Sequence, residues 1–103
     1  MIISGGLNVY PKEIESVINE IEGVIESAVI GLPDDDLGEK VVAVIVREEK
    51  TKITEGDLIL SLKNNIAGFK VPKNIIAVEE LPRNTMGKVQ KNILRDIYAK
   101  MNL

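Results

Sequence analysis

Hydrophobic residues recur along this chain with the spacing of helices. From residue 14 to residue 21 they fall three or four positions apart, and Pro11 stands where a helix can begin without losing a hydrogen bond. Residues 54–57 read Thr-Glu-Gly-Asp, which is typical of a capping box, and predict a second helix that ends at Gly68. A third helix is predicted from about Lys91 to Met101. The side chains expected to face the core are Ile14, Val17, Ile18 and Ile21 in the first helix, Leu58, Ile59, Leu62 and Ile66 in the second, and Leu94, Ile97, Tyr98 and Met101 in the third.

Runs of β-branched residues predict the strands. Residues 2–10 predict a small hairpin around a Gly-Gly pair at 5–6, which supplies the positive φ angles of a tight turn. Residues 24–32 and 41–46 predict two strands that pair antiparallel, and residues 74–80 predict another. The predicted fold is therefore α+β: a small N-terminal β-hairpin and a three-stranded, mainly antiparallel sheet packed with about three helices.

Composition excludes several classes of function. The 103 residues suit one domain with a core of Val, Ile and Leu, because the chain has one Phe, two Tyr and no Trp. No apolar run approaches the roughly 20 residues of a membrane span and no signal-peptide pattern is present, so we expect a cytoplasmic protein. Without cysteine or histidine, the usual transition-metal and general-base sites are missing. Asp34-Asp35-Asp36 lacks the alternating spacing of a calcium loop, so we expect a solvated turn and no metal site.

Charge is distributed unevenly along the chain, although the net charge is only −3. Residues 1–39 hold one basic and nine acidic residues, whereas residues 63–103 hold eight basic and three acidic residues. Clustered positive charge raises the local concentration of phosphates, so the C-terminal part is expected to face an anionic ligand. The same lysines also fit a surface that is merely solvated.

A loop at residues 81–91, Leu-Pro-Arg-Asn-Thr-Met-Gly-Lys-Val-Gln-Lys, carries the candidate chemistry. Gly87 has no Cβ, so the backbone there can take a positive φ and a ligand can approach it. Lys88 would then extend from a fixed base, and its compact ammonium suits a phosphate or carboxylate oxygen. The motif alone also fits a hairpin turn that ends in a solvated lysine.

Three stretches together indicate a family. Residues 2–15 read Ile-Ile-Ser-Gly-Gly-Leu-Asn-Val-Tyr-Pro-Lys-Glu-Ile-Glu, residues 31–39 read Gly-Leu-Pro-Asp-Asp-Asp-Leu-Gly-Glu, and the third stretch is the loop at 81–91. In order and spacing, over essentially the whole chain, they resemble three motifs of the adenylate-forming enzymes, the group that contains acyl-CoA synthetases, adenylation domains of peptide synthetases and firefly luciferase. Those motifs are Gly-Gly-x-Asn-Val-x-Pro-x-Glu-Ile-Glu, Gly-x-Pro-(His or Asp)-x-x-x-Gly-Glu, and Pro-(Arg or Lys)-x-x-x-Gly-Lys-(Ile or Val)-x-(Arg or Lys). The first stretch is more similar to acyl-CoA synthetases than to the adenylation domains of peptide synthetases, which tend to have a single Gly with Arg and Ile there.

The resemblance implies that residues 1–103 form a single C-terminal lid domain, a fragment of a larger enzyme. Its partner in cis would be the N-terminal adenylation domain, which is absent from this sequence, and the family's hinge residue would fall just before Met1. The implied activity is that of an ATP-dependent acid–CoA ligase with a carboxylic acid, ATP and CoA as substrates and Mg²⁺ accompanying ATP. The fragment alone is expected to be inactive, to hold no cofactor tightly and to bind no nucleic acid.

Lys88 matches the family's catalytic lysine. In the first half-reaction it would bridge the carboxylate of the acid and the α-phosphate of ATP, where negative charge builds. Gly87, Arg83 and Lys91 would support the loop or its interface.

The resemblance gives a second group of residues a role in the other half-reaction, after the lid has swung about its hinge. Gly5 and Gly6 would line the passage for the pantetheine arm of CoA, and local turn geometry explains the same glycines equally well. Phe69 and Lys73 match a segment that can contact the nucleotide end of CoA. An arginine sometimes found in the family at the position of Val71 is missing here, and the residues alone favour a core position for Phe69.

Two other classes of function remain open at this point. One is a freestanding module that binds phosphate or nucleic acid through the basic C-terminal part. The other is a dimerising α+β module without chemistry.

Overall fold

The computed structural model describes residues 1–50 and 52–101. Its described part contains five strands, three α-helices and one short 3₁₀ helix at Gly68–Lys70. In chain order the strands and α-helices are β1 (Ile2–Ser4), β2 (Leu7–Val9), α1 (Pro11–Asn19), β3 (Val24–Asp34), β4 (Gly38–Arg47), α2 (Glu55–Lys63), β5 (Asn74–Val78) and α3 (Lys91–Ala99). The predicted fold class is confirmed.

All five strands form one sheet in the order β2-β1-β4-β3, with β5 also paired to β4. β3 and β4 pair antiparallel over almost their full length, whereas β5 runs parallel to β4. The hairpin is part of this sheet, because Ser4 of β1 pairs with Gly38 of β4. β3 therefore lies at the edge of the sheet, and β4 lies in its centre.

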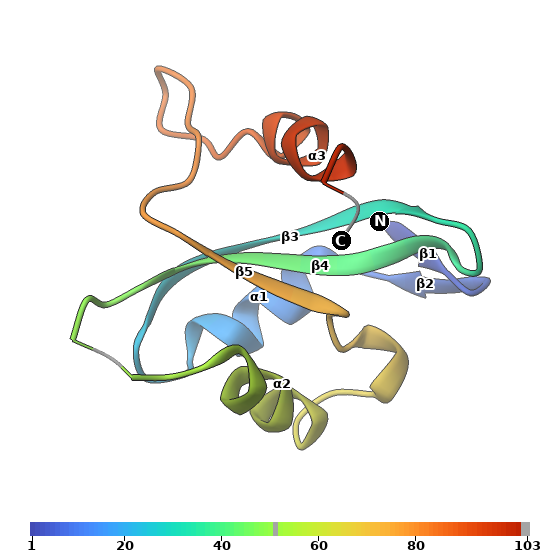
Figure 1. The fold of residues 1–103 in the computed structure, drawn as a ribbon, viewed down its shortest axis with the longest axis horizontal. Coiled ribbons are helices and arrows are strands. Elements are labelled where there is room, and N and C mark those ends of the chain that lie inside the picture. The colour runs from blue at the N-terminus through green and yellow to red at the C-terminus, as the bar shows by residue number, and fades with distance from the viewer. Residues whose placement is uncertain (51, 102–103) are drawn as a thin grey trace.

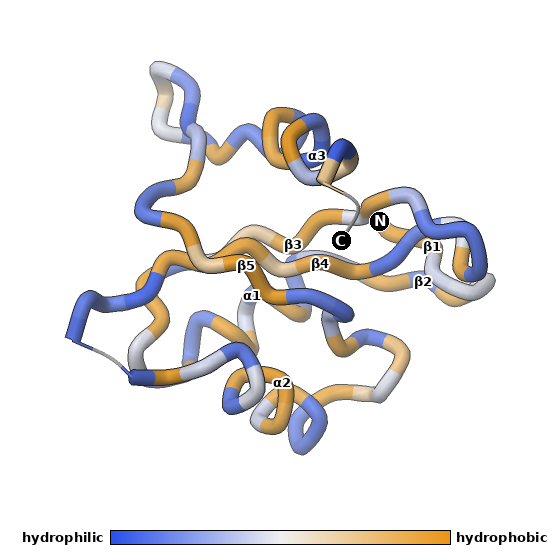
Figure 2. The backbone as a smooth tube through the Cα atoms, viewed as in Figure 1, coloured by the Kyte–Doolittle hydropathy of each residue, from blue (hydrophilic) through white to orange (hydrophobic). Residues whose placement is uncertain are grey.

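Helices cover both faces of the sheet (Figure 1). α1 and α2 lie on one face and α3 on the other, so the domain has three layers. The apolar strands occupy the middle layer, and the turn between β3 and β4 is hydrophilic (Figure 2). Alternate residues of β4 point to opposite faces, which explains its continuous apolar run: Val41, Ala43 and Ile45 join the core under α1 and α2, while Val42 and Val44 join the core under α3.

Local signals in the sequence set the ends of the helices. Pro11 occupies the first turn of α1, and Thr54 and Asp57 form the capping box of α2, each side chain accepting the other residue's backbone N–H. α2 ends at Lys63, earlier than the predicted end at Gly68, and the chain turns there so that Ile66 still packs against the core.

α3 differs from the prediction in the side chains it buries. Leu94 is buried and Tyr98 is half-buried, but Ile97 and Met101 are 46% and 53% exposed. α3 is the only α-helix on its face of the described domain, so only a narrow line of its surface meets the sheet. The predicted inward position of Ile97 and Met101 is therefore wrong.

None of the helices in the described part of the chain is long and apolar enough to cross a membrane.

Candidate functional site

The loop that carries Lys88 is organised by Asn84. The side-chain oxygen Oδ1 of Asn84 accepts two backbone N–H groups, from Met86 at 2.9 Å and from Lys88 at 3.0 Å. The backbone of Asn84 also donates to Lys88 O and accepts from Gly87 N, at 3.0 and 2.9 Å. Asparagine is suited to this arrangement because its short side chain can accept from the backbone a few residues further on. Asn84 thus holds the backbone at Met86, Gly87 and Lys88.

Gly87 has a φ of +82°, so the predicted left-handed conformation is present at this position. Its carbonyl oxygen accepts from Arg83 Nη1 at 2.8 Å. Arg83 also forms a short antiparallel bridge with Val89, and its Nη2 pairs with the carboxylate of Glu26 on β3. The loop is therefore tied to the edge strand of the sheet.

Lys88 itself is exposed, and within residues 1–50 and 52–101 its side chain has no ion-pair partner. Lys91, three residues on, pairs with Glu15 Oε2 at 2.7 Å, and the same oxygen accepts the N–H of Val29 on β3 at 2.7 Å. A fixed backbone with an uncompensated ammonium is an arrangement that can place positive charge at an anionic ligand.

The uneven charge of the sequence is partly neutralised by the fold. Three cations of the basic C-terminal part pair with glutamates of the acidic N-terminal part. These pairs are Lys70–Glu13, Arg83–Glu26 and Lys91–Glu15. The basic surface available to an anion is accordingly smaller than composition suggests. Lys88 is one of the cations on this remaining surface.

The hairpin lies near the other end of β3. Its turn uses Gly5 and Gly6 at φ of +59° and +80°, as predicted from the Gly-Gly pair. Gly5 N donates to Leu37 O at 2.9 Å, which joins the hairpin to the turn between β3 and β4, and Ile3 N donates to Glu39 Oε1 at 3.1 Å. An added Cβ on Gly6 would meet no heavy atom within 4 Å, so the domain leaves the space beside this glycine open.

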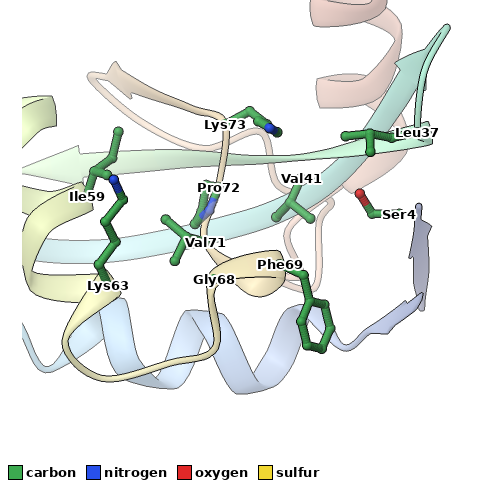
Figure 3. A pocket seen from close by; sticks show the side chains of 10 residues that line it. All are labelled: Ser4, Leu37, Val41, Ile59, Lys63, Gly68, Phe69, Val71, Pro72 and Lys73. Atoms are coloured by element: carbon green, nitrogen blue, oxygen red, sulfur yellow. The ribbon is translucent and has the colours of Figure 1, made fainter. Parts of the chain in front are cut away.

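A cavity of about 350 Å³ lies beside the hairpin, and Phe69 and Lys73 both line it (Figure 3). Ser4 and Leu37 contribute from the hairpin and its neighbouring turn, and Lys63 from the end of α2. The structure thus brings Phe69 and Lys73 to one cavity.

Phe69 is 43% exposed, so the core position favoured by the residues alone is wrong. Phe69 lies within the one-turn 3₁₀ helix Gly68–Lys70 at the surface, and Lys70 Nζ lies over its ring at 5.6 Å from the centroid. Val71, in contrast, is partly buried against the core under α1 and α2, where an arginine would have to project elsewhere.

The two predicted groups of site residues lie at opposite ends of the domain. Figure 1 shows the loop of Lys88 at the upper left and the turn between β1 and β2 at the right. The pairing agrees with this view, because Arg83 pairs with Glu26 near the start of β3, whereas Gly5 contacts Leu37 just beyond its end.

The aspartate run forms a hydrogen-bonded turn. Asp34 Oδ1 accepts the backbone N–H groups of Leu37 and Asp36, both at 2.9 Å, and these bonds hold the pKa of the Asp34 carboxyl below its ordinary value of 3.8. The described residues contain no group of three or more His, Cys, Asp or Glu side chains that could hold a metal ion.

Sequence reasoning missed two residues of the loop's support, Asn84 and Glu26. Asn84 carries a signal that could have been used, since asparagine at the start of a glycine-bearing turn predicts side-chain bonds to the following backbone. Glu26 carries none, because Arg83 lies 57 residues away from it in sequence.

Comparison with known proteins gives a consistent result. Residues 13–88 match the family described as AMP-binding enzyme C-terminal domain. The 2-succinylbenzoate–CoA ligase of Listeria monocytogenes is 53% identical over 99 residues, which are 96% of this chain and 21% of that enzyme. The long-chain-fatty-acid–CoA ligase FadD13 of Mycobacterium tuberculosis is 46% identical over 99 residues, which are 96% of this chain and 20% of that enzyme.

Solved structures agree with the sequence comparison. The crystal structure of ATP-bound MatB from Rhodopseudomonas palustris superimposes with a TM-score of 0.95 at 53% identity, over 98% of this chain and 20% of that one. The chain spans about a fifth of the length of the curated relatives it matches.

Proposed function

This chain belongs to the family of AMP-binding enzyme C-terminal domains, and we propose that it is the mobile lid of an ATP-dependent acid–CoA ligase. In this proposal residues 1–103 are one domain of a longer enzyme, and an N-terminal adenylation domain in cis binds most of the ATP and the carboxylic acid. The names of the similar proteins, which are CoA ligases, support the class of reaction.

The first half-reaction forms the acyl-adenylate. A carboxylate oxygen attacks the α-phosphorus of ATP, a new phosphorus–oxygen bond forms, and pyrophosphate leaves with the electrons of the bond that breaks. The Lys88 ammonium would lie between the carboxylate and the α-phosphate, where it stabilises the negative charge of the transition state. Its role is electrostatic, and no proton has to be transferred.

The proposal is supported by one observation at Lys88: its backbone is held in place while its ammonium is exposed. The backbone of the loop is fixed by Asn84 and Arg83, while the ammonium is exposed and lacks an ion-pair partner in the described chain. Nearby cations such as Lys91 are paired to glutamates instead. A lysine that only kept the surface soluble would not require a loop held in this way.

The second half-reaction would use the other end of the domain. The CoA thiolate attacks the acyl carbonyl carbon, a thioester forms, and AMP leaves. Gly5 and Gly6 present backbone without side chains, with open space beside Gly6, which suits a narrow passage for the pantetheine arm. The cavity lined by Phe69 and Lys73 is the candidate contact for the nucleotide end of CoA.

The separation of the two groups requires the lid to move. Because the Lys88 loop and the hairpin lie at opposite ends of one sheet, a rotation of the domain would exchange them at a single reaction centre. Mg²⁺ would enter with ATP as part of the substrate, and we assign no residue of this chain to it.

The decisive experiment measures the two half-reactions separately in the full-length enzyme. Pyrophosphate exchange measures adenylate formation. Lys88→Ala should slow this step by about 100- to 1,000-fold, the usual loss when one charge-stabilising group is removed. Thioester formation from preformed acyl-adenylate should change little. Lys12→Ala removes another exposed lysine, on α1, and serves as the matched control.

An equal loss of both half-reactions in Lys88→Ala would contradict the proposed role. Salt-sensitive binding of RNA by the isolated 103 residues would favour the phosphate- or nucleic-acid-binding alternative instead.

A further inference from the structure

The peptide group between Gly87 and Lys88 is held at both ends. Its carbonyl oxygen accepts from Arg83 Nη1 at 2.8 Å, and its N–H donates to Asn84 Oδ1 at 3.0 Å. Glycine leaves the adjoining backbone torsions unusually free, so this peptide would otherwise rotate easily. The two hydrogen bonds remove that freedom at the residue from which the lysine side chain extends.

The carbonyl side of this hold depends on a residue of the sheet. Arg83 uses one terminal nitrogen for the Gly87 carbonyl and the other for the Glu26 carboxylate. Because the guanidinium is planar and rigid, the contact of one nitrogen with Glu26 restricts where the nitrogen that bonds the Gly87 carbonyl can lie. The Arg83 and Glu26 side chains are 41% and 29% exposed, so the pair lies at the rim of the domain.

β3 is built so that Glu26 reaches the correct face. The register of β3 against β4 shifts between Val24 and Glu26, which pair with Arg47 and Val46, so β3 has one extra residue there. Val24 belongs to the core under α1 and α2, whereas Val46, opposite Glu26, belongs to the core under α3. Residues two apart in a regular strand share a face, so the bulge is what turns Glu26 toward the Lys88 loop.

We infer that Glu26 is a positioning residue for Lys88, which it orients through Arg83 and the Gly87 carbonyl. Glu26 touches no substrate in this inference, and the inference rests on the proposed role of Lys88. A small displacement of the Lys88 ammonium should slow adenylate formation, because electrostatic stabilisation depends on where the charge lies in the transition state.

The test is a double-mutant cycle on the full-length enzyme. Glu26→Ala should lower the rate of adenylate formation about tenfold, with the KM for ATP changed by less than about twofold and thioester formation from preformed adenylate unchanged. Glu26→Gln, which keeps an acceptor oxygen, should recover part of the rate. The double variant Glu26→Ala/Arg83→Ala should be no slower than Arg83→Ala alone, because both changes remove one interaction. Glu22→Ala is the matched control, an exposed glutamate just before β3.

Three results would overturn the inference: a Glu26→Ala rate equal to that of Glu22→Ala, equal losses in both half-reactions, or additive losses in the double variant. Lys88→Ala in the same assay separates the two levels of the proposal. If adenylate formation is slow in Lys88→Ala but normal in Glu26→Ala, only the role of Glu26 fails. If Lys88→Ala forms adenylate at the normal rate, the proposed function fails and this inference fails with it.

Discussion

The Lys88 loop and the Gly5-Gly6 hairpin are both tight turns with glycine at positive φ, yet they are held in different ways. In the loop, side chains reinforce the backbone bonds: the Asn84 amide oxygen accepts two backbone N–H groups, and Arg83 links the Gly87 carbonyl to Glu26. Backbone contacts hold most of the hairpin, through pairing of β1 with β2 and the bond from Gly5 N to Leu37 O.

This difference corresponds to what each turn presents. The loop presents a charge on a long, flexible side chain, and such a charge is useful only when its base is fixed. The hairpin presents backbone without side chains, and pairing within the sheet is sufficient to fix it. Removal of a side chain should therefore impair the half-reaction that uses the loop, whereas an added side chain should impair the half-reaction that uses the hairpin.

After Lys88→Ala, the largest effect is expected from Gly6→Leu. A Cβ at Gly6 meets nothing within 4 Å, so the domain itself should lose only the backbone strain of φ +80°, about 1–2 kcal/mol. Thioester formation from preformed acyl-adenylate should nevertheless fall by about 100-fold, because the side chain occupies the passage for CoA. Gly38→Leu, at φ +81° and also with open space, controls for strain. A comparable loss of adenylate formation in Gly6→Leu would remove the division of labour between the two turns.

A smaller effect is expected from Asn84→Ala, which removes the acceptor shared by Met86 and Lys88. Two lost hydrogen bonds at about 0.5–1.5 kcal/mol each should lower the free energy of unfolding and slow adenylate formation roughly tenfold. Asn84→Asp keeps an acceptor oxygen and should recover most of both. Asn92→Ala, an exposed change on α3, is the control for helix and surface effects. Equal activity of the Ala and Asp variants would show that the shared acceptor does not matter.

Lys91→Ala should have a smaller effect still, on stability. Its partner Glu15 keeps the N–H of Val29, so no buried group is left unsatisfied. The free energy of unfolding should fall by about 1 kcal/mol, the upper end of the range for ion pairs at the surface, because this pair is half-buried. Urea unfolding of the 103-residue chain at low and high salt measures this, and the difference from the wild type should shrink at high salt. Lys100→Ala is the matched control, and a loss that salt does not change would contradict an electrostatic origin.

The smallest effect is expected from acid, which should act on the turn between β3 and β4 and on the capping box of α2, because the pKa values of Asp34 and Asp57 are both lowered by hydrogen bonds. Backbone N–H groups of Leu37 and Asp36 lower the pKa of Asp34, so its folded value lies below its unfolded value near 3.8. The stabilisation is therefore fully present above about pH 4 and is lost as the pH falls through the folded pKa.

Melting temperatures between about pH 6 and pH 2 test this expectation. The wild type should lose more stability on acidification than Asp34→Asn, which cannot titrate but keeps an acceptor oxygen. Asp35→Asn, next in the same turn, should follow the wild type. Parallel curves for wild type and Asp34→Asn would show that the turn is not held by the carboxylate.

Local rules predicted much of the fold. The period of Ile14 and Ile18, the capping box at Thr54 and the Gly-Gly turn each act within a few residues, so the sequence displays them directly. Parallel pairing of β5 with β4 is decided by distant contacts, and so is the exposure of Ile97 on a helix that rests on the sheet by a narrow line.

The candidate site divides in the same way. Lys88 and its glycine are visible in the sequence because the turn and the charge are adjacent. The exposure of Phe69 was not predictable from its type, since a lone aromatic residue is more often buried. The pairs Lys70–Glu13 and Arg83–Glu26 each join residues 57 positions apart, and nothing in their local sequence connects them.

The extra residue in β3 gives this edge strand one place where its length can change. An in-frame loss of Ile25 would make Val24 and Glu26 consecutive residues of a regular strand, whose side chains point to opposite faces, so each would keep the face it has now. A deletion of one residue elsewhere in β3 would instead turn the side chains on one side of it to the other face. Among homologues, gaps of one residue in β3 should therefore gather at this place.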